Sequence, residues 1–209
     1  MELRDAIEQI SRIHTQLAAT ERLRSLRAIP VALSGVFAIA IALLQPTIVG
    51  NPLARPDLYL LLWCGAAIAS GVLAAAVVVR RALRTPGALS VANARLAAMQ
   101  FLPCLLVGVI VTWFVAARMP HELWLLPGLW QLLFGLGNLA AHRLLPLPGV
   151  FIGIAYLATG SCCLWFEERA LDPWAMGLPF ASGQLALAAI LWWHHERTEH
   201  DAFVPEVRR

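Results

Sequence analysis

The chain has 209 residues, of which 59% are hydrophobic and 14% are charged, and its formal net charge is +3. Soluble domains carry about 25% charged residues, so this composition indicates lipid as the main solvent and excludes an ordinary soluble fold. All sixteen basic residues are arginines, spread over several segments. Because a nucleic-acid-binding protein needs a clustered basic face, we expect no nucleic-acid partner.

The first 28 residues form a charged segment with one apolar face. Leu3, Ile7, Ile10 and Leu17 recur at helical spacings. The segment carries too many charges to span a bilayer, so it predicts a cytoplasmic amphipathic helix over residues 1–28 that lies on the membrane surface or pairs with another helix. A secretory signal peptide is not expected, because a long polar stretch precedes the first apolar run.

Six apolar stretches occupy residues 29–193. An apolar helix needs about 20 residues to cross a hydrocarbon core of about 30 Å. The sequence therefore predicts an all-α polytopic membrane protein, with a six-helix transmembrane bundle over residues 29–193 and a charged tail over 194–209. The predicted spans are 29–49, 58–79, 96–117, 123–141, 150–166 and 174–193, and a long loop over 80–95 separates the second from the third.

The arginines predict the orientation of these spans. Thirteen of the sixteen lie on the side that carries both termini, and only Arg55, Arg118 and Arg169 lie on the other side. Cytoplasmic loops carry the excess of basic residues in membrane proteins. We therefore expect a multi-pass protein of the bacterial inner membrane, surrounded by the lipid bilayer, with its N- and C-termini in the cytoplasm.

Short repeated patterns predict how the spans are grouped. Residues 71–75, 137–141 and 183–187 each begin with glycine and continue with Leu and Ala at matching positions, in the second, fourth and sixth spans. This spacing indicates three repeated helical hairpins, each entering from the cytoplasm and returning to it. Chance repetition within a small apolar alphabet is the alternative explanation.

Few polar side chains are available for chemistry inside the spans. No Asp, Glu, Arg or His lies in the middle of any of them, which argues against an ion-driven pump and against an intramembrane hydrolase. Gln131 and Asn138 share one face of the fourth span with Gly135 and His142, and Gln184 occupies the position of Asn138 in the short repeat. Gln131, Asn138 and Gln184 are therefore candidate ligand-binding residues that line a cavity.

Two structural interpretations compete with that binding site. Asn and Gln side chains also hydrogen-bond between membrane helices, typically for ~1 kcal/mol or less. Small residues at four-residue spacing, Gly65 with Ala69 and Gly149 with Gly153, predict close helix packing.

No metal, cofactor or catalytic site is expected from the motifs. The stretch from His195 to His200 is one residue longer than the H-E-x-x-H zinc motif, and it is typical of a solvated helix end. The four cysteines, Cys64, Cys104, Cys162 and Cys163, form no CxxC pair and read as small buried hydrophobes. Glycine-rich nucleotide-binding motifs and nucleophile elbows are absent from the sequence.

The residues also resemble a family. Residues 21–26 and 33–37, together with the last hairpin from Gly149 to Arg197, look like uncharacterised bacterial six-span membrane proteins. More distantly, the three-hairpin layout resembles the HdeD-like acid-resistance membrane proteins. The resemblance implies a six-span fold and offers no catalytic residue.

Two functions are consistent with these features. The first is a non-enzymatic membrane protein of structural, stress-related or regulatory type that acts through helix–helix contacts, as a homo-oligomer or with a membrane partner protein. The alternative is a transporter or carrier for a small apolar or lipidic ligand that enters near Asn138 and Gln184. A membrane enzyme is a third and weaker hypothesis, because no nucleophile or cofactor motif supports it.

Overall fold

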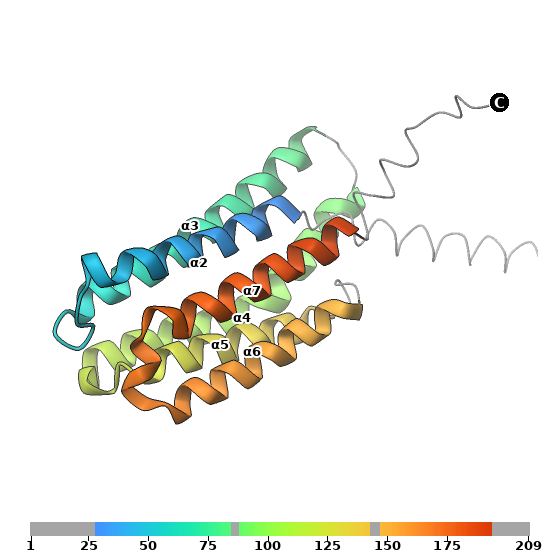
Figure 1. Ribbon diagram of the computed structural model, residues 1–209. Coiled ribbons are helices and arrows are strands. Elements are labelled where there is room, and N and C mark those ends of the chain that lie inside the picture. The colour runs from blue at the N-terminus through green and yellow to red at the C-terminus, as the bar shows by residue number, and fades with distance from the viewer. Residues whose placement is uncertain (1–27, 85–87, 143–146, 194–209) are drawn as a thin grey trace, which may run out of the picture.

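The computed structural model describes residues 28–84, 88–142 and 147–193, and within them it contains helices and no strand (Figure 1). The long helices are α2 (Ala28–Ile48), α3 (Pro56–Arg84), α4 (Ala88–Arg118), α5 (Leu125–Ala140), α6 (Leu147–Trp165) and α7 (Pro173–Leu191), with short 3-10 turns η1 (Pro120–Glu122) and η3 (Glu167–Leu171) between them. Among the described residues, five helices are long and apolar enough to cross a membrane. The all-α prediction is confirmed, and these helices indicate a multi-pass membrane protein.

The fourth predicted span, residues 123–141, is shorter in the structure than expected. Helix α5 has 16 residues, which at 1.5 Å per residue span about 24 Å, less than the hydrocarbon core of about 30 Å. The turn η1 and the N-cap Trp124 delay its start until Leu125. Leu123, which the prediction placed inside the span, is instead fully buried in the core before the helix begins.

The predicted loop over residues 80–95 is wrong. Helix α3 continues to Arg84 and α4 begins at Ala88. Arginine is a good helix former, so only the Pro86–Gly87 pair interrupts the helical pattern here. The amphipathic helix expected before Ala28 and the charged tail over 194–209 lie outside the described residues.

Four glycines allow helices α5 and α6 to pack with their backbones almost in contact. A Cβ atom built on Gly128 would lie 2.8 Å from the carbonyl oxygen of Gly160, and one on Gly160 would lie 2.8 Å from that of Gly128. Seven residues further along α5, Gly135 meets Gly153 in the same way, at 2.8 Å. A seven-residue repeat keeps one face of each helix on its partner in a left-handed crossing. The close packing expected at Gly153 is therefore confirmed.

Small residues also join the first and last helices of the bundle. Helices α2 and α7 run antiparallel, and a Cβ atom on Gly177 would lie 2.6 Å from the Cβ atom of Ala42. Ala38 and Ala181 are buried in the same interface. These α2–α7 and α5–α6 contacts are the most extensive in the structure. Both join helices from different predicted hairpins, whereas the partners within each hairpin contact each other less.

The two outermost helices, α3 and α4, have their described buried core residues at one end of the bundle. Tyr59, Trp63 and Val115 belong to a buried cluster near η1 and η3, with Leu126 and Met176. We call this end of the bundle the loop end. The second buried cluster, at the opposite end, contains residues of α2, α6 and α7 and, among the described residues, none of α3 or α4. Figure 1 shows α3 leaning away from the other helices toward its C-terminal end.

One expected contact is absent. A Cβ atom on Gly65 would meet nothing within 4 Å among the described residues, and Ala69 is exposed. The prediction that these two residues pack against a neighbouring helix is therefore wrong within the described chain, because α3 has already left the bundle at this level.

The glycines of α5 and of α3 should respond differently to the same substitution. Gly128→Ala should lower the free energy of unfolding by about 1–3 kcal/mol, because the added methyl group overpacks the interface. Gly65→Ala should leave stability unchanged or raise it by up to about 1 kcal/mol, since the helix gains a better helix former in open space. Thermal unfolding of both variants in detergent micelles measures the difference, and equal effects would contradict the close α5–α6 contact.

Candidate functional site

Four polar side chains are buried inside the described bundle: Gln45, Gln131, Asn138 and Gln184. The sequence predicted the last three as candidate binding residues. A buried amide needs hydrogen-bond partners, since an unpaired polar group costs roughly 1–3 kcal/mol. The partners of each amide therefore indicate whether it serves packing or has capacity left for a ligand.

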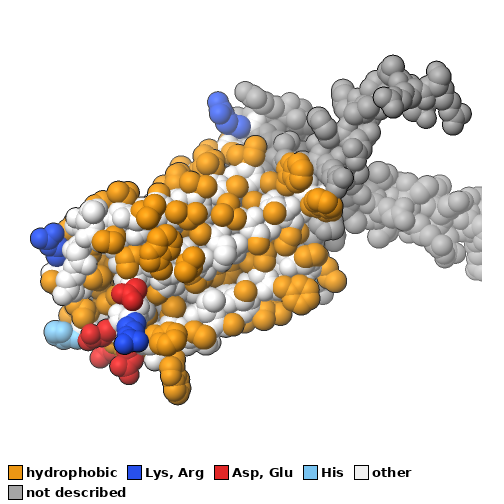
Figure 2. Space-filling view, viewed as in Figure 1, with side chains coloured by type: hydrophobic (Ala, Val, Ile, Leu, Met, Phe, Trp, Pro, Cys, Tyr) orange, Lys and Arg blue, Asp and Glu red, His pale blue; other side chains and the backbone are white. Residues whose placement is uncertain are grey.

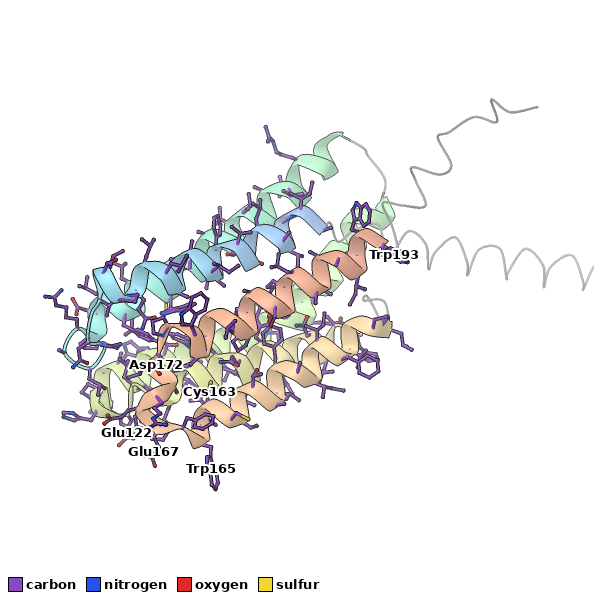
Figure 3. All side chains as sticks on the ribbon, in the orientation of Figure 1. Glu122, Cys163, Trp165, Glu167, Asp172 and Trp193 are labelled. Atoms are coloured by element: carbon purple, nitrogen blue, oxygen red, sulfur yellow. The ribbon has the colours of Figure 1, made fainter. Side chains whose placement is uncertain are left out.

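Gln131 of α5 is held between α6 and α7. Its Nε2 atom donates to the carbonyl oxygen of Ala175 at 3.1 Å and to the Sγ atom of Cys163 at 3.3 Å, with the Met176 sulfur 3.8 Å away. Its Oε1 atom is buried and has no hydrogen-bond partner in the described chain. Figure 3 shows Cys163 near the loop end, close to the labelled acidic residues. The side-chain nitrogen of Gln131 is therefore hydrogen-bonded, whereas its side-chain oxygen has no donor among the described residues.

Asn138 lies seven residues after Gln131, about 10.5 Å further along α5. It is buried, and its Nδ2 atom has no hydrogen-bond partner among the described residues. The two other members of the predicted face behave differently: Gly135 packs against α6, and the His142 ring is exposed and bonds to the carbonyl oxygen of Leu139 at 2.8 Å. Asn138 is thus an unused donor in the half of the bundle away from the loop end.

Gln184 faces α2. Its Cβ atom lies 3.2 Å from the Cβ position built on Gly35, inside the α2–α7 interface. No hydrogen bond within the described ranges joins any two of Gln131, Asn138 and Gln184. Gln131 is held at the contact of α5 with α6 and α7, whereas Gln184 packs in the contact of α7 with α2.

Aromatic rings fill the bundle at the level of α5 between Gln131 and Asn138. Phe134 makes edge-to-face contacts with Phe101, Tyr156 and Phe180, with ring centroids 5.1 to 5.2 Å apart. These four rings come from α4, α5, α6 and α7. Gly183 leaves room for them, because a Cβ atom there would lie 2.5 Å from the Tyr156 hydroxyl oxygen. The two predicted α5 amides are therefore separated by close packing.

Gln45 is the buried amide that sequence reasoning missed. Its Nε2 atom donates to the carbonyl oxygen of Leu171 at 2.8 Å, and its Oε1 atom accepts from the indole nitrogen of Trp63 at 2.8 Å. One side chain thus ties α2 to α3 and to η3. The signal was present in the sequence, because Gln45 continues the buried positions of Gly35, Ala38 and Ala42 at spacings of three and four.

The charged side chains of the described chain gather mainly at the loop end (Figure 2). Figure 3 labels Glu122, Glu167 and Asp172 there, with Trp165 at the same end and Trp193 at the opposite one. Glu167 has a left-handed backbone, with φ of 50°, which is uncommon outside glycine and marks the sharp turn after α6. Within the described residues, no group of three His, Cys, Asp or Glu side chains is placed to hold a metal ion.

Comparisons with protein-family models, with curated proteins and with solved structures gave no match to this chain. The functional argument therefore depends on the residues and their geometry alone.

The two buried glutamines Gln45 and Gln184 offer a matched test of the hydrogen-bond tie. Gln45→Leu should lower the free energy of unfolding by about 1–3 kcal/mol, because it leaves the Trp63 indole and the Leu171 carbonyl without their partner. Gln184→Leu should cost less than about 1 kcal/mol, since this amide makes no hydrogen bond within the described chain. Thermal unfolding in detergent measures both, and a larger loss in the Gln184 variant would contradict the assignment.

Proposed function

We propose that this chain is a non-enzymatic, six-span protein of the bacterial cytoplasmic membrane that acts through helix–helix contacts with another membrane protein or with a second copy of itself. In this proposal the short helix α5 also crosses the membrane, which brings the number of spans to six. The six helices form three successive hairpins, and both termini lie in the cytoplasm. The arginine bias of the sequence supports this orientation. The resemblance to uncharacterised six-span bacterial membrane proteins is consistent with it.

The observation that carries the proposal is the uncovered half of α3. Only 6% of the α3 span is buried in the chain, the same share as in the α4 span, against 33% of α2 and 39% of α7. From Ala67 to Ala76 nearly every residue of α3 is exposed, and small residues predominate. Lipid-facing helices do not require small side chains, whereas closely packed membrane helices do. A half-helix of this composition, exposed among the described residues, supports an intermolecular helix contact.

The packing around the buried amides favours this function over a carrier. Gln131 is held by Ala175 and Cys163, four aromatic rings pack beside it, and Gln184 lies in a tight helix interface. A transport path would need an opening along these residues. Because they are closely packed, we assign them a structural role.

Photo-crosslinking in native membranes tests the proposed contact. A benzoyl-phenylalanine at Ile68, which is 66% exposed on α3, should form protein adducts, whereas the same group at Ile154, which is 50% exposed on α6, should react with lipid only. The molecular mass of the adduct separates a second copy from another protein. Lipid adducts alone at both positions would contradict the proposal.

A carrier for a small apolar or lipidic ligand is the second candidate, and a specific observation favours it. The Nδ2 atom of Asn138 and the Oε1 atom of Gln131 are buried and unpartnered, and buried polar atoms in proteins are almost always paired. A ligand carbonyl or hydroxyl oxygen would accept from the Asn138 donor, and a separate ligand hydroxyl group would be needed to donate to the Gln131 acceptor. Liposome flux that disappears in the Asn138→Leu, Gln184→Leu double variant would support the carrier, and unchanged flux would exclude these residues from the path.

A further inference from the structure

We infer that an anionic phospholipid occupies the space between the C-terminal half of α3 and the facing stripe of α4, with its phosphate at Arg80 of α3 and an acyl chain along both helices. This inference goes beyond the proposed function, and it rests on it only for the orientation, in which the arginine end of α3 lies in the cytoplasm. The partner proposed for α3 would contact the other, outward face of the same helix.

The first support is the separation of α3 from α4. The two helices contact each other little, although they are consecutive and joined by the short segment 85–87. The buried core residues that the structure describes on both helices lie at the loop end, whereas α4 also packs against α5 further along, where the Phe101 ring contacts Phe134 and Gly137. Inside a bilayer, apolar surfaces that do not touch each other must be covered by hydrocarbon.

The second support is an uncovered apolar stripe on α4. On α5, Trp130 faces α4, because its indole nitrogen donates to the Thr112 hydroxyl of that helix. The next residue, Gln131, points to α7. In an antiparallel helix pair, the residue after a facing residue lies on the same side of the pair on both helices. Val109 follows Gly108, which faces α5, and so lies on the α7 side.

Two leucines one and two turns before Val109 extend this stripe. Leu102, Leu105 and Val109 are exposed by 51%, 51% and 67% in the chain. Because α3 and α4 run antiparallel from the 85–87 segment, this stripe is level with the exposed residues of α3 around Gly71. Two apolar surfaces at one depth are therefore exposed in the chain without covering each other.

Charge complementarity selects the occupant. Helix α3 continues beyond its apolar span as far as Arg84, and its last two turns carry Arg80, Arg81 and Arg84. Arg80 is exposed, and no described carboxylate lies within ion-pair distance of it. Gly71 is nine residues from Arg80, about 13.5 Å along the helix, close to half of a hydrocarbon core of about 30 Å. A phospholipid whose phosphate lies at Arg80 would therefore have an acyl chain long enough to reach Gly71.

The same arginines argue against a second copy of the chain in this position. A parallel copy of α3 in the space between α3 and α4 would place a second Arg80 beside the first, and like charges at close range repel. An anionic headgroup removes this repulsion, since a basic residue near a negatively charged membrane surface contributes about 1 kcal/mol. The occupant with a negative head and a hydrocarbon tail is a phospholipid of the cytoplasmic leaflet.

Native mass spectrometry of the full chain from nanodiscs tests the inference. The nanodiscs contain phosphatidylcholine with phosphatidylglycerol in both leaflets, so the result does not depend on the orientation of the protein. The wild-type chain should retain one phosphatidylglycerol in preference to phosphatidylcholine. Arg80→Gln should lower this retention roughly fivefold, and Leu105→Trp, which fills the space, should abolish it with every arginine in place.

Matched variants keep the outcome specific. Arg118→Gln removes an arginine from the other membrane side, and Ile154→Trp adds the same bulk to the exposed face of α6, so both should retain the lipid at the wild-type level. Soluble glycerol phosphate should not compete. Equal retention of both lipids, equal losses in the control variants, displacement by glycerol phosphate, or a dimer in place of the lipid-bound monomer would each overturn the inference.

Discussion

The backbone contact between α5 and α6 is the constraint on which the rest of the bundle depends. Gly128 and Gly135 on one helix meet Gly160 and Gly153 on the other, and any Cβ atom there would overlap a carbonyl oxygen. Membrane helices gain little from burying apolar surface, so they associate through close van der Waals contact. With α5 and α6 locked together, α7 packs against α6, and α2 packs against α7 through Ala42 and Gly177. These four helices form the inner unit.

Helix α3 is attached to this unit through α2, and helix α4 is attached to it through α5. Gln45 connects α2 to Trp63 of α3 and to the carbonyl oxygen of Leu171, and Trp130 of α5 bonds to Thr112 of α4. Both ties lie toward the loop end, where the buried cluster is also located. Further from the loop end, Phe101 of α4 packs against Phe134 and Gly137 of α5, whereas the described residues of the C-terminal half of α3 have no comparable tie. The N-terminal part of α3 is therefore fixed by its contacts with Gln45. The position of its C-terminal half depends on the lipid or protein that surrounds it in the membrane.

The sequence predicted helix type and approximate helix position well, because both depend on local composition. Long apolar runs form helices whatever their neighbours are. Errors arose where the composition was misleading: arginines near residue 80 were taken for a loop, although arginine continues a helix. The length of α5 was overestimated because Leu123 is as apolar as a span residue, while it is buried beside a turn.

Helix neighbours were harder to predict, for a physical reason. Gly65 and Gly153 have the same local pattern of small residues, yet one meets open space and the other meets a backbone oxygen. A glycine permits close approach without specifying what approaches it. The short repeats grouped the helices into consecutive hairpins, but the tightest contacts link α2 to α7 and α5 to α6, because that is where small residues on both partners coincide in register.

The hydrogen bonds of the buried polar residues were hard to predict for the same reason. Spacing correctly placed Gln131 and Asn138 on one face of α5, but their partners come from distant helices, and their hydrogen bonds depend on which residue arrives opposite. Gln131 meets the Ala175 carbonyl, which has no intrahelical donor because the residue four positions later is Pro179, and proline carries no backbone N–H. Gln45 satisfies both of its polar atoms and so stabilises the bundle. Asn138 retains an unused donor, and a buried donor without a partner in its own chain is the position at which a binding partner gains most.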